Sequence, residues 1–226
     1  MIIYGKQLFL HVLKRHFKRI IEVYLAKDIE KPLFNEIVKT GAKIIRVDNK
    51  KAQALAAGGN HQGLLAKIEP VSFCDINELK QKDFIAVLYG LSDVGNIGAI
   101  SRTAYALGCD GLAIVGKSAN LAGILRSSSG AALELPIALV PDGLSLLNEL
   151  KQVGFSLYAT AAGGKNVSLV KFDKKLALVL GSEGDGLSAK VIAKCDKTVG
   201  VRLKNGFDSL NVSAAFAIIC DRIVNE

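Results

Sequence analysis

The chain has 226 residues, of which 50% are apolar and 22% are charged. This length allows one or two domains with a substantial core, and the composition excludes a mainly disordered protein. The 29 Lys and Arg against 21 Asp and Glu give a net charge of +8.

The positive charge is concentrated in the first third of the chain. Residues 1–73 hold 13 Lys/Arg and six Asp/Glu, whereas residues 74–226 hold 16 and 15. A basic module raises the local concentration of polyanions such as nucleic acid, but a surface tuned for solubility shows the same excess. The charge alone therefore leaves both interpretations open.

Signals for metal binding and for membranes are weak. The four cysteines are scattered without a CxxC pair, and His11 and His16 are five residues apart, off the i,i+4 face of a helix. No apolar run approaches the roughly 18 residues of a membrane span, and the early Lys6 is not typical of a signal peptide. We therefore expect no metal, no membrane and a reduced, cytoplasmic protein.

Residues 1–73 alternate between helix-like and strand-like segments. An apolar helical face covers 8–17, and strand-like runs cover 20–25, 43–48 and 64–68. Short helices are predicted around 35–40 and up to about residue 57. A polar stretch follows, of which residues 74–83 are predicted to be a linker.

From residue 84 onward, apolar strands and helices alternate regularly. Strand-like runs cover 84–90, 111–116, 135–140, 155–160, 176–181 and 197–203, and a final apolar helix covers about 210–223. Continuously apolar strands separated by helices are typical of a parallel sheet covered on both faces. The sequence thus predicts two α/β domains, 1–73 and 84–226.

Ligands of open α/β sheets bind at the carboxyl ends of strands, so the segments that follow the strands are the candidate sites. After the first apolar strand, Asn96 is placed to cap a helix, which is a structural role. On that helix Arg102 shares its face with small residues, so either a structural ion pair or an external anion satisfies its guanidinium. The small residues are Gly95, Ala99 and Ala106.

Two later segments have similar features. Glu183 lies among Gly181, Gly184 and Gly186 after an apolar strand, in a pattern that is neither G-x-G-x-x-G nor a Walker loop. By itself this pattern also fits a plain turn. Before the last helix, Asp208 or Ser209 is expected as the cap, and the free amides of the first turn could receive a ligand. Three such sites on one sheet suggest a composite pocket.

Together these segments resemble the three motifs of the SpoU (TrmH) class of RNA ribose 2′-O-methyltransferases, in the SPOUT superfamily. The first is Asn96-Ile97-Gly98-Ala99 with Arg102, the second Leu180-Gly181-Ser182-Glu183-Gly184 with Gly186-Leu187, and the third Ser209-Leu210-Asn211-Val212-Ser213. The intervening Ser129-Gly130-Ala131, Glu134 and Pro136 also resemble a family segment. The resemblance covers residues 84–226.

The N-terminal part is similar to the RNA-binding extension of family members that methylate a guanosine in 23S rRNA. That extension resembles a ribosomal-protein-like α/β domain. The residues that carry this likeness are Tyr4-Gly5, Glu22-Val23-Tyr24-Leu25, His61-Gln62-Gly63 and Ala66.

The resemblance implies an α/β fold with a deep trefoil knot in about residues 176–226, which binds S-adenosylmethionine. It also implies a homodimer with active sites at the subunit interface. Two departures stand out: Val94-Gly95 replace a frequent Pro-His, and Arg202 follows Val201 where the family usually has Ile-Pro. The second leaves the cofactor contacts near Val201 open.

The resemblance also implies roles for individual residues. In mechanisms described for the family, the arginine that corresponds to Arg102 activates the ribose hydroxyl, but a guanidinium is a poor base. We therefore expect Arg102 to grip an RNA phosphate and to stabilise developing oxyanion charge. The residues expected to orient it and the target nucleotide are Asn96, Glu183, Ser209 and Asn211. Cofactor contacts are expected around Thr160, Gly181, Val201 and Leu210, and RNA contacts from Lys6, Lys14, Arg15, Lys18 and Arg19.

The sequence thus predicts an S-adenosylmethionine-dependent enzyme that methylates a ribose 2′-hydroxyl, expected to be that of a guanosine, in 23S rRNA. One alternative is a tRNA guanosine 2′-O-methyltransferase. Another is a non-catalytic RNA-binding protein that assists ribosome assembly with the same fold.

Overall fold

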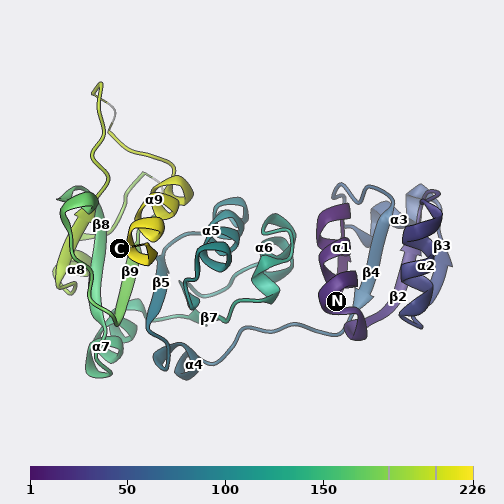
Figure 1. Cartoon of the computed structure of the whole chain (residues 1–226), viewed down its shortest axis with the longest axis horizontal. Coiled ribbons are helices and arrows are strands. Elements are labelled where there is room, and N and C mark those ends of the chain that lie inside the picture. Colours follow the sequence, from purple (N-terminus) through teal and green to yellow (C-terminus); the bar gives the residue numbers. More distant parts are fainter. Residues whose placement is uncertain (183, 207, 226) are drawn as a thin grey trace.

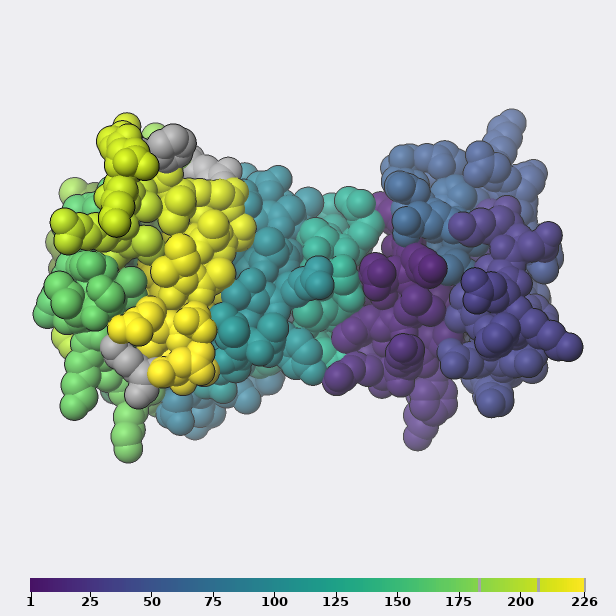
Figure 2. All heavy atoms as spheres, turned by 45° about the horizontal axis from the view of Figure 1, so that its top comes forward, coloured from purple at the N-terminus to yellow at the C-terminus, as the bar shows by residue number. Residues whose placement is uncertain are grey.

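Two β-sheets, one near each end of the molecule, organise the chain in the computed structural model (Figure 1). The structure describes residues 1–182, 184–206 and 208–225. A space-filling view shows the N-terminal part as a separate lobe beside the rest of the chain (Figure 2). None of the helices in these described ranges is long and apolar enough to cross a membrane.

The N-terminal sheet has four strands in the order β1-β4-β2-β3. Only β2 and β3 pair in parallel, whereas β4 is antiparallel to both of its neighbours. Val23 and Leu25 face the core under helices α1 and α2, and Tyr24 packs with Leu65 under α3 on the other face. The elements are β1 (Ile2–Tyr4), α1 (Lys6–Arg15), η1 (Phe17–Arg19), β2 (Ile20–Leu25), α2 (Lys31–Lys39), β3 (Lys43–Arg46), α3 (Asn49–Leu55) and β4 (Leu64–Ile68).

The second sheet has six strands, all parallel, in the order β10-β8-β9-β5-β6-β7. Every residue of the central strands β9 and β6 is buried, which explains why these segments are continuously apolar. The strands are β5 (Phe84–Tyr89), β6 (Gly111–Val115), β7 (Ile137–Val140), β8 (Ser156–Asn166), β9 (Leu176–Leu180) and β10 (Lys197–Gly200). The predicted parallel sheet is confirmed.

Helices cover both faces of this sheet, as the sequence predicts. Ala86 and Leu88 of β5 pack in the core with α5, α6 and α9, whereas Ile85 and Val87 pack in the core with α4 and α7. The helices are α4 (Ile76–Lys80), α5 (Val94–Leu107), α6 (Leu121–Ser127), η2 (Ala131–Leu133), α7 (Gly143–Gln152), η3 (Val167–Leu169), α8 (Ala189–Ile192) and α9 (Val212–Val224).

Strand β8 continues to Asn166, six residues beyond the predicted run 155–160. Its extension approaches β10 so closely that a Cβ on Gly164 would lie 2.5 Å from the Val199 carbonyl carbon. Gly164 therefore lies in a part of the strand that requires a residue without a side chain, whereas a Cβ on its neighbour Gly163 would meet nothing within 4 Å.

The predicted linker, residues 74–83, contains helix α4. The backbone N–H of Cys74 donates to the Ile137 carbonyl of β7, and Leu79 is fully buried in the core of the second sheet. These residues pack onto the six-stranded sheet, so the freely running connection after β4 is short.

Replacement of Leu79 tests this packing. We expect Leu79→Ala to lower the free energy of unfolding by about 2–5 kcal/mol, because a buried leucine side chain is removed and a cavity remains. Urea unfolding measures the change. Leu169→Ala is the control, since Leu169 is 69% exposed and its truncation should cost below about 0.5 kcal/mol. Equal effects of the two variants would contradict the burial of α4.

Candidate active site

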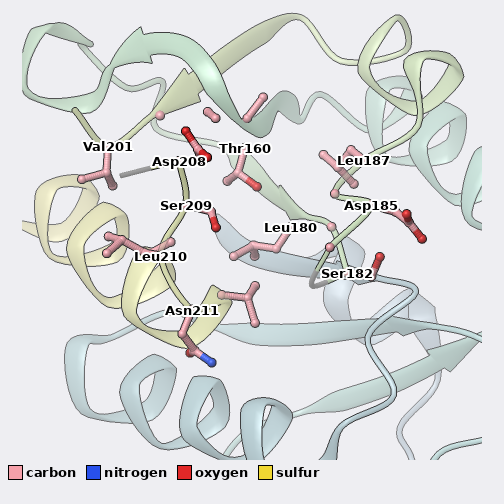
Figure 3. Close-up of a pocket in the computed structure, with 18 of the residues that line it drawn as sticks. Thr160, Leu180, Ser182, Asp185, Leu187, Val201, Asp208, Ser209, Leu210 and Asn211 are labelled. Atoms are coloured by element: carbon pink, nitrogen blue, oxygen red, sulfur yellow. The ribbon is translucent and has the colours of Figure 1, made fainter. Parts of the chain in front are cut away.

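A cavity of about 610 Å³ lies where three segments meet at the carboxyl ends of β8, β9 and β10. One wall comes from the extension of β8, another from the loop after β9, and the third from the segment that leads from β10 into α9 (Figure 3). This is the edge of a parallel sheet at which α/β proteins bind ligands.

Glycines allow the three segments to approach one another. A Cβ on Gly181 would overlap the backbone of Gly186, and a Cβ on Gly200 would overlap the carbonyl oxygen of Ala161. Gly186 also has a φ of +64°, in the left-handed region that favours glycine. The glycine pattern after β9 is thus more than a plain turn, because it lets backbone atoms form the cavity wall.

The four residues predicted to contact a cofactor all line this cavity. They are Thr160, Gly181, Val201 and Leu210. The Thr160 hydroxyl donates to the Val179 carbonyl at 3.1 Å, so this side chain also ties β8 to β9. The sequence patterns did not identify Ala161 and Ala162, which line the cavity as well. An apolar stretch that runs past the expected end of β8 is the signal that could have found them.

Asn96 does not cap helix α5, contrary to the first expectation. The cap is Asp93, whose carboxylate accepts from the Asn96 backbone N–H at 2.7 Å, and the helix begins at Val94. The Asn96 side chain is therefore available, and its Oδ1 accepts a hydrogen bond from Asn211 Nδ2 at 3.0 Å. The structural role belongs to Asp93, so the amide of Asn96 serves another purpose.

Asn211 is the cap of helix α9, so the expectation that Asp208 or Ser209 caps it is wrong. Its Oδ1 accepts from the backbone N–H and from the hydroxyl of Ser213, at 2.9 and 2.6 Å. Its Nδ2 donates to Asn96, which fixes the start of α9 against α5. Asp208, Ser209 and Asn211 all line the cavity (Figure 3).

Arg102 is exposed on α5 and is not among the described residues that line the cavity. Within the part of the chain that the structure describes, its guanidinium has neither a hydrogen bond nor an ion pair. The structural ion pair considered from the sequence is therefore not formed among the described residues, and the exposed guanidinium can reach an external anion. The predicted Glu183 lies outside the described residues.

Cysteine chemistry does not contribute to the cavity. Burial raises the pKa of the Cys74 and Cys195 thiols to about 11 and that of Cys220 to about 12, and it also raises that of Cys109. Thiols with such pKa values stay protonated at neutral pH and are poor nucleophiles.

The five predicted RNA-binding residues are exposed on α1, η1 and the residues beside them: Lys6, Lys14, Arg15, Lys18 and Arg19. Arg15 also contacts the second lobe, because its Nη1 donates to the Tyr105 hydroxyl at 3.0 Å. Tyr105 lies on α5, three residues after Arg102, so both side chains share one region of the helix. The basic helix therefore borders the helix that carries Arg102.

Two family models cover most of the chain. The SpoU rRNA methylase family matches residues 83–221, and the RNA 2′-O ribose methyltransferase substrate-binding family matches residues 2–74. Among curated proteins, the 23S rRNA (guanosine-2′-O-)-methyltransferase RlmB of Vibrio cholerae is 30% identical over 238 residues, which span 100% of this chain and 96% of that protein. RlmB of Haemophilus influenzae is 30% identical over 99% of this chain and 97% of its own length.

Solved structures show the same fold. The SpoU methyltransferase AviRb from Streptomyces viridochromogenes, in complex with AdoMet, has a TM-score of 0.81 at 22% identity and covers 100% of this chain and 89% of its own. An AdoMet-bound rRNA methyltransferase from Sinorhizobium meliloti has a TM-score of 0.78 at 20% identity, with 98% and 85% covered. These likenesses confirm the predicted fold class, a SPOUT α/β knot with a small N-terminal α/β domain. The chain belongs to the SpoU rRNA methylase family.

Proposed function

We propose that this protein transfers a methyl group from S-adenosylmethionine to the 2′-hydroxyl of a guanosine in 23S rRNA. The observation that carries the proposal is the cavity at the strand ends, whose α9 wall is tied through Asn211 to Asn96 on the helix that carries Arg102. A cofactor pocket and a side chain suited to an RNA phosphate thus belong to one connected unit. The relatives named for 23S rRNA guanosine methylation match the full chain.

The cavity fits S-adenosylmethionine in size and in the chemistry of its wall. Its volume of about 610 Å³ lies in the range of small-molecule sites. Backbone groups around Gly181, Val201 and Leu210 are suited to hold the adenosine part, because the glycines leave the main chain accessible. Asp185 and Asp208 also line the cavity and bring negative charge to it, which suits a cofactor with a cationic sulfonium.

S-adenosylmethionine supplies a methyl group on a sulfonium, which is already a good leaving group. The task left to the protein is to place the ribose hydroxyl in line with that methyl and to stabilise the charge that develops on its oxygen. Arg102, with no partner in the described part of its own chain, is suited to bind an RNA phosphate in two-point geometry. Asn96, Ser209 and Asn211 then orient the nucleotide at the cavity.

A homodimer brings Arg102 to a cavity. Arg102 is not among the described residues that line the cavity of its own chain, and α5, α9 and the segment before α9 expose apolar side chains. Tyr105 is 37% exposed, Leu210 38% and Ile218 41%. Burial of this surface against a second copy stabilises the dimer and places Arg102 of one copy near the cavity of its partner.

The N-terminal lobe is proposed to hold the RNA. Its exposed lysines and arginines gain affinity from phosphate contacts and the release of counterions. Because 23S rRNA is made and assembled in the cytoplasm, the proposal also places the protein there.

The test incubates the protein with labelled S-adenosylmethionine and with separated rRNA and tRNA, and then maps the 2′-O-methyl sites. Label in tRNA alone would replace the proposal, and no label in either would leave RNA binding without catalysis.

Gly181→Ala tests the cofactor pocket. Since the new Cβ overlaps the Gly186 backbone and overpacking costs about 1–3 kcal/mol, S-adenosylmethionine should bind about tenfold more weakly or worse. Titration calorimetry measures the dissociation constant. Gly163→Ala is the matched control, because a Cβ there meets nothing within 4 Å. Normal binding by the Gly181 variant would refute the placement of the cofactor.

Arg102→Ala tests the role of the arginine. We expect the variant to fold and to bind S-adenosylmethionine normally, while kcat falls about 10²–10³-fold because charge stabilisation is removed. A filter assay of methyl transfer to rRNA measures kcat, and calorimetry measures cofactor affinity. Lys194→Ala removes an exposed cation on the α8 side of the sheet and should leave both unchanged. Near-normal turnover by Arg102→Ala would remove Arg102 from the mechanism.

Replacement of Lys14, Lys18 and Arg19 by Ala tests the basic helix. The slope of log affinity against log salt should become shallower by about 0.7–0.9 for each RNA phosphate that the variant no longer neutralises. RNA binding is measured by fluorescence anisotropy at several salt concentrations. A triple variant at Lys174, Lys190 and Lys194, all exposed on the other lobe, should keep the original slope. Equal slopes for both triple variants would show that the RNA does not follow α1.

A further inference from the structure

Glu134 joins the two lobes through one carboxylate oxygen. Its Oε1 accepts from the Nε2 of His11 and from the Nε2 of His16, each at 2.7 Å. Glu134 follows η2 in the lobe of the six-stranded sheet, whereas both histidines come from the end of α1 in the N-terminal lobe. The three side chains are 16–21% exposed, so water screens these contacts only in part.

The end of helix α1 explains how two histidines five residues apart reach one oxygen. The helix stops at Arg15, and His16 has φ −132° and ψ 30°, outside the helical region. The imidazole of His16 therefore turns back, and its ring centroid lies 5.9 Å from that of His11. On a continuous helix, side chains five residues apart point in different directions. Because α1 ends before His16, this separation does not apply, and the sequence pattern therefore did not predict the contact.

The distances favour hydrogen bonds over a shared metal ion. A length of 2.7 Å is that of a charge-assisted N–H···O contact. Two ligands bound tetrahedrally to zinc, each at about 2.0–2.1 Å from it, lie about 3.4 Å apart. The possible ligand atoms of His11, His16 and Glu134 all lie within 4.8 Å of one another. However, the Glu134 oxygen lies closer to each imidazole nitrogen than two zinc ligands lie to each other. A metal ion could therefore replace the hydrogen-bonding protons only if the side chains moved apart.

Further contacts surround this triad of His11, His16 and Glu134. A Cβ on Gly130 would lie 2.6 Å from the His11 ring, so the absence of a side chain there makes room for the imidazole. The Arg126 guanidinium of α6 lies 5.4 Å from the centre of the Tyr4 ring of β1. With the Arg15–Tyr105 hydrogen bond, these contacts link α1 and β1 to α5, α6 and η2, where the lobes meet (Figures 1 and 2).

The negative charge on Glu134 suits its contact with the two histidines. Burial raises the pKa of its carboxyl, but the hydrogen bonds from His16 and His11 together outweigh burial and hold the pKa below its ordinary value. The carboxylate is therefore ionised at neutral pH, and the docked arrangement of the lobes favours that ionised form.

We propose that Glu134, His11 and His16 form a latch that fixes the RNA-binding lobe beside α5, and that they are positioning residues for rRNA. The latch rests on the proposed function, because it acts by directing RNA held on the basic helix toward Arg102. It has no contact with the cavity and therefore leaves S-adenosylmethionine binding and the chemical step unchanged. Its loss lets the RNA-binding lobe move, so that only a fraction of the molecules present both lobes in the arrangement that binds rRNA, and the apparent KM rises as that fraction falls.

The test uses the full chain with Glu134→Ala, which removes both hydrogen bonds. With a 23S rRNA fragment as substrate, KM should rise about fivefold or more, while kcat at saturating RNA and the dissociation constant of S-adenosylmethionine stay unchanged. Glu134→Gln keeps an acceptor without the charge and should give an intermediate KM. Asp28→Asn is the matched control, because it removes an exposed ion pair with Arg46 in the same lobe but away from the contact.

A double-mutant cycle separates the latch from two unrelated losses. Because His16 acts only through Glu134, His16→Ala combined with Glu134→Ala should raise KM no more than Glu134→Ala alone. Additive effects would overturn the proposal. So would a wild-type KM in Glu134→Ala, or a fall in kcat at constant KM.

Two measurements without RNA complete the test. Small-angle scattering of Glu134→Ala should show a larger radius of gyration than wild type at equal thermal stability, and an unchanged radius would overturn the latch. A chelator should leave the radius of gyration of the wild type unchanged, and a rise would replace the hydrogen bonds by a metal ion. Failure of the wild type to methylate rRNA would instead contradict the proposed function, whatever the scattering shows.

Discussion

The tightest constraint in this molecule is the approach of backbone to backbone at the carboxyl ends of β8, β9 and β10. A side chain at Gly181 or Gly200 would overlap a neighbouring main chain, so these positions exclude every residue larger than glycine. The cavity exists because the main chain itself forms much of its wall. The positions of α9 and α5, and of the polar groups at their N-terminal ends, follow from that close packing.

Two asparagines connect this geometry at the cavity to helix α5, which carries Arg102. Asn211 uses its oxygen to cap α9 and its nitrogen to bind Asn96, while Asp93 caps α5 and leaves the Asn96 amide free to accept. The Asn211–Asn96 hydrogen bond links the two helices, so neither can slide along the other without breaking it. The orientation of the Arg102 face of α5 therefore depends on the cavity loops.

Much of the fold could be predicted from the sequence, because burial on both faces makes the central strands continuously apolar. The limits of the elements could not, since local choices compete. Asp93 and Asn96 are both residue types that cap helices well, and either could begin α5. Asp208, Ser209 and Asn211 offer the same choice for α9. Tertiary contacts decide which residue becomes the cap. Gly163 and Gly164 lie beyond the predicted run 155–160, yet their strand is stabilised by β10. The three motifs predicted the cavity, but they did not predict that Arg102 is exposed and lies outside the described lining of the cavity.

The short connection between the lobes has a consequence for the strength that their contact requires. Residues 69–73 join β4 to Cys74, which is already hydrogen-bonded to β7, and the six Cα–Cα steps from Ile68 to Cys74 span at most about 22 Å. Such a tether holds one lobe at an effective concentration in at least the millimolar range around the other. An association too weak to detect between separated lobes would thus keep them docked in the intact chain, so that a large folded RNA meets both lobes as one surface.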